Sequence, residues 1–244
     1  KSLDFDTPLP HAKKSDCLFL EKAKKVNAVL RNKSPKQLID LMGISSNLAD
    51  LNYDRNQIWN SKPDAPGARS AVYAFNGEVY RGLDIYSLDV HQIGFVQQTL
   101  RILSGQYGML RPLDQILPYR LEMGTKLAIG TSKNLYEFWR KDVTQALRDS
   151  LESDEVIVNL ASNEYAKCVD FESLPNTTIT PVFKELKKGA FKVISVYAKH
   201  ARGLMARYII ESKAKSREDL MAFCSGGYVF SQELSAGDQL VFVR

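Results

Sequence analysis

The hydrophobic pattern of the first fifty residues predicts three helices. Pro8 and Pro10 keep the opening segment extended, because proline lacks the backbone N–H that a helix interior needs. Ser34-Pro35 is a typical helix start, and Gly43 is a typical helix end. The expected helices cover 17–32, with Ser15 and Asp16 as the cap, 35–43, and 45–53.

Beyond residue 60 the pattern alternates between helical spacing and short β-rich runs. Asn76-Gly77 and Lys187-Lys188-Gly189 each lie between two apolar runs and predict hairpin turns. This mixture favours a single α+β domain over 1–244, in which helices flank a mixed β-sheet. The expected strands are 70–75, 78–80, 156–160, 178–183, 190–198, 228–230 and 239–243, and the expected helices are 88–103, 134–151 and 199–211.

The stretch LRILSGQYGMLRPLDQILPYRLEMG, over 100–124, has the densest pattern of glycine and proline in the chain. Gly105 and Gly108 flank two residues between expected helices, so a helix-hairpin-helix-like element is one interpretation. Glycine permits the tight turn that points several N–H groups at a phosphate. The expected contacts come from the turn and from two nearby cations, and they are Ser104, Gly105, Gln106, Tyr107, Gly108, Arg111 and Arg120.

Two other interpretations of this stretch remain open. Hairpins of the helix-hairpin-helix type usually have one residue between the glycines, whereas G-x-x-G is the backbone clamp of KH domains. Either version would contact phosphate and sugar, and would therefore bind without sequence preference. The other possibility is structural, a helix C-cap followed by a proline-initiated turn.

Positive charge is concentrated in one part of the chain. The net charge is +5, but residues 184–217 hold ten Lys or Arg against two Glu, a local balance of +8. A helix over 199–211 would bring Lys199, Arg202 and Arg207 within an arc of about 140°. Gly203 lies inside this arc and would let a backbone or a ligand come close. Such a face fits a polyanion, although a solvated amphipathic surface helix would have the same pattern.

A polar cluster at the end of the expected strand 156–160 suggests a second kind of site. Residues just past the carboxyl end of a strand often line a cleft, although these could also cap a following helix. If the protein is an enzyme, we expect Glu164, Tyr165 and Lys199 to act in it. Glu122 and Asn159 would line the same cleft.

Composition and motifs exclude several classes of protein. The three cysteines are far apart, which favours reduced thiols in the cytosol, and no apolar run approaches the ~20 residues of a membrane span. Neither a Walker loop nor a dinucleotide fingerprint occurs. The histidines are isolated, with no second ligand at metal spacing. We therefore expect no metal and no cofactor, and nothing in the sequence identifies a protein partner.

Five runs in the chain form a specific combination. They are KSLDFDTPL at 1–9, FNGEVYRGLD at 75–84, LSGQYGMLRPLDQILPYRLEMG at 103–124, NLASNEY at 159–165 and YAKHARGLMARYII at 197–210. Together they extend nearly from end to end and resemble the YaaA family of peroxide stress proteins, which are cytosolic bacterial proteins. Family members usually begin with a short strand ending in Ser-Pro-Ala-Lys. Lys1 corresponds to that lysine, so the resemblance implies a preceding strand and makes Lys1 a cleft residue.

The resemblance implies a function as well as a fold. It implies a positively charged cleft, a helix-hairpin-helix-like element that binds duplex and branched DNA, and a role in limiting iron-dependent peroxide damage. Mapped by motif, 104–111 would be the hairpin, and Lys199, Arg202 and Arg207 the basic wall. Asn76 departs from the family, which often has Lys there, and this weakens a role for position 76 in binding an anion.

Our leading hypothesis is a cytoplasmic protein that binds DNA without sequence preference during peroxide stress. The main alternative is an enzyme that acts on a nucleoside, a nucleotide or a damaged base in the same cleft. A third, weaker interpretation is an iron-handling protein. The leading hypothesis depends on one arrangement, in which the Gly105 turn and the Arg202 helix face the same polyanion.

Overall fold

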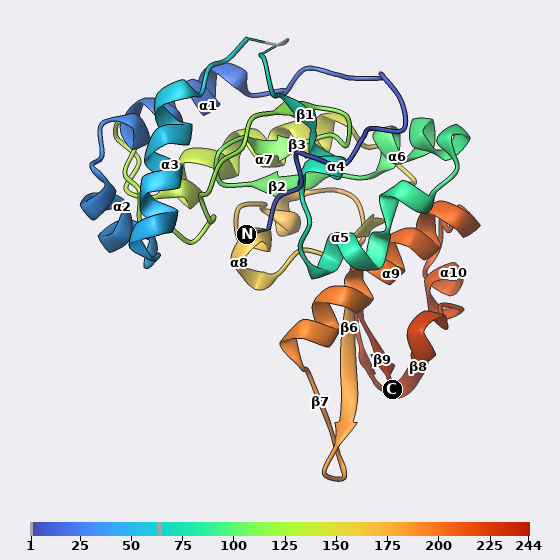
Figure 1. Cartoon of the computed structure of the whole chain (residues 1–244). Helices are drawn as coiled ribbons and strands as arrows, with labels where there is room; N and C mark the ends of the chain where they lie inside the picture. The colour runs from blue at the N-terminus through green and yellow to red at the C-terminus, as the bar shows by residue number, and fades with distance from the viewer. Residues whose placement is uncertain (1, 63–64) are drawn as a thin grey trace.

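The computed structural model describes residues 2–62 and 65–244, and it contains a helical body with a projecting β-sheet (Figure 1). The body holds the helices α1 to α8 and two small hairpin-like sheets. The sheet that projects from it ends in the β6–β7 hairpin, and α9 lies along the junction (Figure 1). The expected α+β class, with helices that flank a mixed sheet, is confirmed.

The predicted N-terminal helices are confirmed as α1 (Leu20–Arg31), α2 (Pro35–Met42) and α3 (Ser46–Ile58). Ser34 begins α2 with a capping box, in which its hydroxyl accepts the N–H of Gln37. Gly43 ends α2 in the left-handed conformation, with φ 62°. Ser15 does not cap α1, because its hydroxyl donates instead to Asp114 Oδ1 at 2.7 Å.

The hairpin predicted at Asn76-Gly77 is wrong. The apolar run before it forms the short buried helix α4 (Ala71–Ala74), and Gly77 is the N-cap of α5 (Glu78–Leu83). Short apolar runs fit a buried helix as well as a strand, so local pattern does not separate the two. The strand at this place is β1 (Arg69–Ser70), which pairs antiparallel with β4 (Gln115–Ile116).

The segment before the glycine pair also differs from the prediction. The expected helix over 88–103 is limited to α6 (Ile93–Thr99), and the chain then forms β2 (Ile102–Ser104). β2 pairs antiparallel with β3 (Gly108–Leu110), so 102–110 is a β-hairpin. α7 (Leu135–Asp149) is confirmed, with the Asn134 side chain as its cap, and α8 (Asn163–Ala166) is a single turn. The 3-10 helices are η1 (Ile85–Ser87), η2 (Val90–Gln92), η3 (Phe171–Ser173) and η4 (Ser225–Gly227).

The projecting sheet contains parallel and antiparallel pairs. Its order is β5 (Ile157–Val158), β6 (Thr178–Lys187), β9 (Gln239–Val243) and β8 (Val229–Ala236). β6 is parallel to β5 and β9, and antiparallel to β7 (Ala190–Lys192). The strand expected over 190–198 ends early, because α9 (Ser195–Ser212) begins there, and α10 (Arg217–Met221) follows.

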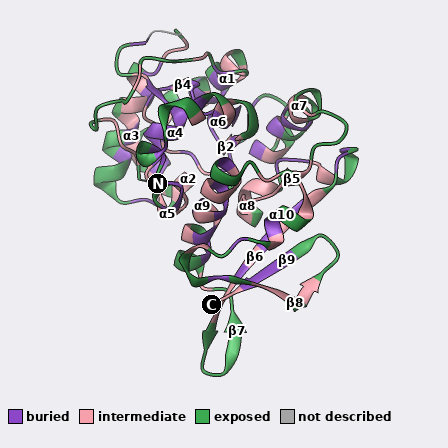
Figure 2. Cartoon of the chain, turned by 90° about the vertical axis from the view of Figure 1, so that its right-hand side faces the viewer, coloured by how far each residue is buried: buried purple, intermediate pink, exposed green. Residues whose placement is uncertain are grey.

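Helix α9 connects two hydrophobic clusters. Ala206 and Ile210 belong to the cluster of the body, whereas Ala201 and Met205 belong to the cluster under the sheet. The helix is therefore buried along two sides, unlike the surface helix that its sequence suggests. Figure 2 shows the same contrast, because the β7 hairpin is exposed while buried residues concentrate in the body and on the inner strands.

Candidate nucleic-acid interface

The Gly105–Gly108 turn is buried, which overturns its predicted role in contacting DNA. Ser104, Gln106 and Tyr107 are all 2% exposed or less. A Cβ on Gly105 would lie 2.6 Å from the Leu121 carbonyl oxygen, and one on Gly108 would lie 2.6 Å from the Trp139 ring. The glycines are needed because neighbouring chain packs directly onto the turn. The prediction of a helix-hairpin-helix element here is wrong. The alternative of a turn that is packed for structural reasons is closer to what is observed, although the turn joins two strands and does not end a helix.

The polar groups of this turn are used inside the body. Trp59 Nε1 donates to Tyr107 Oη at 2.8 Å, and Tyr107 Oη also accepts the Leu117 N–H. Gln106 donates to the Ala23 carbonyl, and Ser104 is hydrogen-bonded to Tyr119. These side chains therefore have partners and cannot reach a phosphate.

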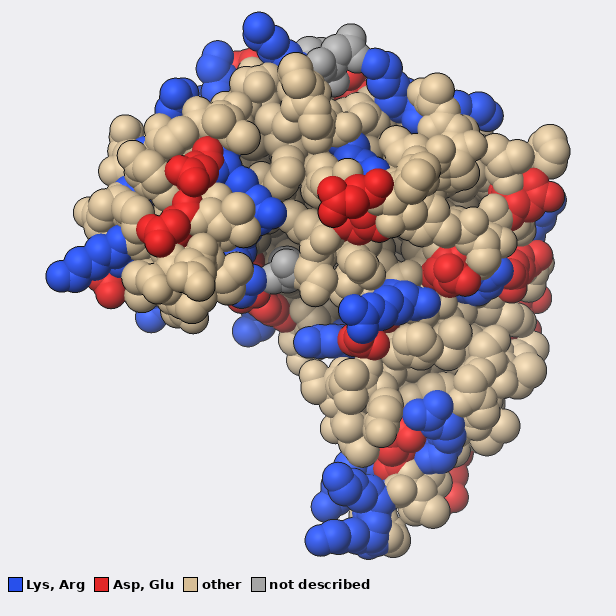
Figure 3. All heavy atoms as spheres, in the orientation of Figure 1, with Lys and Arg blue, Asp and Glu red and all other residues tan. Residues whose placement is uncertain are grey.

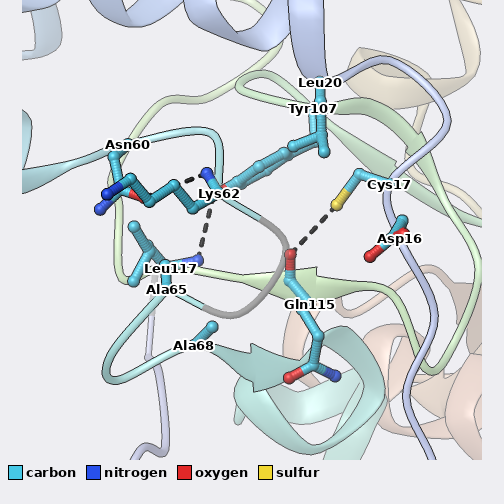
Figure 4. A pocket seen from close by; sticks show the side chains of 10 residues that line it. All are labelled: Asp16, Cys17, Leu20, Asn60, Lys62, Ala65, Ala68, Tyr107, Gln115 and Leu117. Carbon is cyan, nitrogen blue, oxygen red and sulfur yellow. Dashed lines mark hydrogen bonds between the residues drawn. The ribbon is translucent and has the colours of Figure 1, made fainter.

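A small cavity next to Tyr107 offers no room for a ligand. Its volume is about 10 Å³, which is about the size of one water. Figure 4 shows Cys17 and Tyr107 at its wall, and the thiol of Cys17 donates to the Gln115 carbonyl at 3.1 Å. Burial raises the pKa of Cys17, so this thiol is protonated at neutral pH and is a poor nucleophile.

The two arginines that were expected to flank the hairpin already have carboxylate neighbours. Arg111 forms an ion pair with the fully buried Asp114 at 3.1 Å and donates to the Asp16 carbonyl. Arg120 lies 3.8 Å from Glu122. Arg111 thus holds the N-terminal segment to the body, and its charge is largely compensated.

Helices α2 and α3 are consecutive and are joined by a short turn. The turn contains Gly43, Ile44 and Ser45, of which Ile44 is buried while Gly43 and Ser45 are exposed. Ser45 makes no side-chain capping bond, so the first N–H groups of α3 are left for solvent or for an anion. The sequence predicts both helices and Gly43, but the denser glycine pattern at 105–108 obscures this turn.

Helix α9 separates its three predicted cations into different environments. Arg207 donates to the Leu83 and Asp84 carbonyls and pairs with Glu211 at 2.8 Å, so it is engaged within the protein. Gly203 is covered by α5, because a Cβ there would lie 1.9 Å from the Val79 carbonyl oxygen. The predicted close approach at Gly203 is confirmed, because the backbone of α5 lies against it. The prediction that Gly203 contacts DNA is wrong.

Like the exposed Lys199, Arg202 is a cation of α9 that stays available. Its position on the helix falls between Ala201 and Met205, which face the sheet, and Ala206, which faces the body. It is partly buried, and desolvation lowers its pKa. Within the described ranges it has no hydrogen-bond or ion-pair partner. A partly buried, uncompensated guanidinium is costly, so this position favours an anion.

Exposed lysines surround the projecting hairpin. Figure 3 shows Lys and Arg side chains gathered at the tip of the projection, and the outline of the molecule is hollowed between this projection and the body. α2 and α3 lie at the end of the body that borders the hollow (Figure 1). For the part of the chain that is described, the exposed lysines of this region form no ion pair, and they are Lys187, Lys188, Lys192 and Lys199.

The residues of the alternative enzyme site are partly used for structure. Glu164 Oε1 accepts the Gly124 N–H at 2.9 Å, and its backbone carbonyl accepts the Tyr136 hydroxyl. Asn159 Oδ1 accepts the Ala161 N–H, which precedes α8. The N-cap of α8 is Ser162, which makes no side-chain capping bond, so the expected capping of a following helix by these side chains is not observed. Neither the cavity at Cys17 nor a larger one beside α5 is lined by Glu164, Tyr165 or Lys199. Lys1 lies outside the described residues.

Comparison with known proteins places the chain in a family. A family model described as peroxide stress protein YaaA matches residues 1–234. The chain belongs to the YaaA family. It is 50% identical over 244 residues to a UPF0246 protein of Flavobacterium johnsoniae, which covers all of this chain and 97% of that relative. A UPF0246 protein of Saccharophagus degradans is 49% identical over 246 residues, covering all of this chain and 96% of its own length.

The helices and the metal-ligating side chains of this YaaA-family chain bear on two further predictions. In the described part of the chain, no helix is long and apolar enough to cross a bilayer. Across the same residues, no group of three or more His, Cys, Asp and Glu side chains is placed to hold a metal ion.

Proposed function

We propose that this YaaA-family protein binds DNA without sequence preference and thereby limits iron-dependent damage to DNA during peroxide stress. The family description supplies peroxide stress. The observation that carries DNA binding is Arg202, a partly buried cation without an anionic partner in the described chain. It lies on the side of α9 between the residues that face the sheet and those that face the body. A backbone phosphate is an anion of suitable size, and it occurs at regular spacing along DNA.

Two further elements support a polyanion over a single anion. The lysines of the β6–β7 hairpin would neutralise phosphates along one side of the hollow. The α2–α3 turn, with its exposed Gly43 and uncapped Ser45, would act as the helix-hairpin-helix-like element on the other side. These contacts reach phosphates and not base edges, which accounts for the lack of sequence preference. A protein that covers DNA in this way would shield it from iron-generated radicals without binding iron.

The enzyme alternative has less support in this cleft. The carboxylate of Glu164 is already hydrogen-bonded to the Gly124 backbone, and no enclosed cavity among those described here joins it to Lys199. Catalysis by general acid or base needs such groups within reach of a substrate atom. We therefore place DNA binding first.

The test compares Arg202→Ala with Arg207→Ala on the same helix. Arg207 is engaged by Asp84 and Glu211, so its removal should leave the affinity for DNA nearly unchanged. Loss of Arg202 should weaken binding to a duplex about tenfold and reduce the salt slope by about one. Fluorescence anisotropy at two salt concentrations measures both. If Arg202→Ala binds with the wild-type affinity and slope, the proposed interface is wrong.

A further inference from the structure

A second cavity, with a volume of about 230 Å³, lies beside α5, and none of the residues proposed to contact DNA lines it. It is formed by Asp4 from the opening segment and by residues between 72 and 86. Two of the runs that distinguish the sequence, KSLDFDTPL and FNGEVYRGLD, therefore meet at this cavity. No residue of the buried turn or of α9 lines this cavity, although Asp84 at its wall contacts Arg207 of α9. The function proposed above assigns the cavity no role.

Aromatic rings form much of the wall of this cavity. Tyr73 and Tyr86 lie with their ring centroids 5.0 Å apart, and Phe75 and Tyr80 lie 5.2 Å apart. Arg69 is buried behind them and donates to the Tyr86 hydroxyl and to the Thr7 carbonyl. This arginine fixes the opening segment against the ring wall. The result is a preformed aromatic lining against which a planar ligand can pack.

The polar lining is rich in hydrogen-bond acceptors. Asp4 Oδ1 accepts the N–H groups of Asp6 and Thr7, and the Thr7 side chain also hydrogen-bonds this carboxylate. A carboxylate has about four acceptor sites, so one remains for a further donor. Burial tends to raise the pKa of Asp4, but these hydrogen bonds outweigh it and leave the pKa lowered, so Asp4 is ionised at neutral pH. Asp84 adds a second carboxylate, whose Oδ2 accepts the Ser87 hydroxyl and lies 3.8 Å from Arg207, so Oδ1 is the oxygen left for a ligand. Asn76 adds an amide that both donates and accepts.

We propose that this cavity binds a nucleobase with an exocyclic amino group, stacked on the ring wall and donating its N–H groups to Asp4 and Asp84. Flat rings with donors on one edge match an aromatic wall with carboxylates at its rim, which is how proteins hold bases taken out of a helix. Arg81 also lines the cavity, and its charge disfavours a simple organic cation. The base arrives either in a free nucleoside or as an unpaired nucleotide in DNA.

The first experiment titrates the full chain with cytidine, adenosine, guanosine and thymidine by calorimetry. The three nucleosides with an amino group should bind, and thymidine should bind at least about tenfold more weakly, because it lacks that donor. Asp4→Asn keeps an oxygen for the Asp6 and Thr7 N–H groups but removes the charge. It should weaken binding about tenfold.

The matched control is Asp6→Asn, which makes the same change on an exposed neighbour that does not line the cavity. It should bind nucleosides like the wild type. Asp84→Asn is a second test variant in case Asp4→Asn lowers the melting temperature of the protein. The proposal is overturned if no nucleoside binds at about millimolar concentration, if both test variants bind like the wild type, or if tetramethylammonium displaces the nucleoside.

A DNA arm separates the two sources of the base. A duplex with one unpaired cytosine is compared with the fully paired duplex, for wild type and Asp4→Asn. A preference for the unpaired cytosine that Asp4→Asn loses supports a base presented by DNA. Nucleoside binding with no such preference supports a free nucleoside. Arg202 does not line the cavity, so a failure here leaves the result for Arg202→Ala unaffected, and the reverse also holds.

Discussion

The arginines of this chain show how local partners decide whether a cation is available. Arg111 and Arg207 look as suitable as Arg202 in the sequence, but both contact carboxylates within the fold. Arg202 has no such neighbour in the described ranges. Spacing along a helix predicts which side chains share a face, whereas carboxylates from distant segments decide which charges are compensated.

The cysteines differ in a way that bears on peroxide chemistry. Cys17 and Cys168 are buried, and burial raises the pKa of Cys168 to about 12 and that of Cys17 further. Cys224 is exposed. Because the thiolate is the reactive form, the two buried thiols should not react with peroxide in the folded protein.

We predict that Ellman's reagent titrates one thiol in the native protein and three after denaturation. Cys224→Ser should remove the native reaction, and Cys168→Ser should leave it unchanged. Rapid modification of Cys17 in the native state would contradict the burial of this residue, and mass spectrometry of the labelled peptides identifies the modified site.

At the scale of elements, the crossing of α5 and α9 determines how the body meets the projecting sheet. Gly82 and Gly203 lie at the contact, where a Cβ on Gly82 would be 2.2 Å from the His200 carbonyl oxygen. The two backbones therefore touch almost directly. A helix pair this close cannot admit a side chain without moving apart.

Gly203→Ala should lower the free energy of unfolding by about 3 kcal/mol or more, because the new methyl group would overlap the Val79 carbonyl. Gly94→Ala in α6 is the matched control. A Cβ at Gly94 meets nothing within 4 Å, so alanine there should stabilise the protein by about 0.5–1 kcal/mol. Urea unfolding monitored by tryptophan fluorescence measures both. Equal stabilities for the two variants would show that α5 and α9 are not in backbone contact.

At the scale of the whole molecule, the hollow between body and projection brings distant segments to one surface. The N-terminal pair α2–α3 borders the hollow at one end, and the β6–β7 hairpin projects at the other (Figure 1). Part of the charge of residues 184–217, at Lys187, Lys188 and Lys192, lies on the projecting hairpin, where Figure 3 shows Lys and Arg side chains gathered. The shape thus turns a moderate net charge into a local basic surface.

We predict that Lys187→Gln with Lys188→Gln reduces the salt slope of DNA binding by about two, because each lysine neutralises about one phosphate. The matched control, Lys24→Gln with Lys25→Gln, changes two adjacent exposed lysines on α1, away from the hollow. It should preserve the slope. Both pairs lie outside the cores, so melting temperatures should not change. Equal losses in the two double variants would indicate diffuse attraction and not a defined interface.

The sequence correctly predicted elements whose ends are encoded locally. Ser34-Pro35 and Gly43 define α2, and Asn134 caps α7, because capping depends on residues within one helical turn. The Lys187–Gly189 turn was likewise predicted and is present. The sequence indicated Arg202 and Lys199 as residues of the candidate DNA-binding site. That they contact DNA is still a proposal.

The sequence failed where burial decides the outcome. Nothing local distinguishes the exposed glycine turn at 43 from the buried one at 105–108, because Trp139 and Leu121, which cover the latter, come from other segments. The local pattern of 71–80 fits a hairpin, but 71–74 forms α4 beside β4, and 78–80 belongs to α5, which packs against α9. The cavity beside α5 joins Asp4 to a segment about seventy residues away, which no spacing rule predicts.

The amino-acid sequence by itself determined the family, the α+β class and the helices with capped ends, since each depends on residue identity or on contacts within a few positions. Tertiary structure alone decided which glycine turn is exposed, which of Arg111, Arg202 and Arg207 have a carboxylate neighbour, and where aromatic rings line a cavity. The physical reason is that burial and charge compensation are properties of packing between distant segments, and only the folded chain brings those segments together.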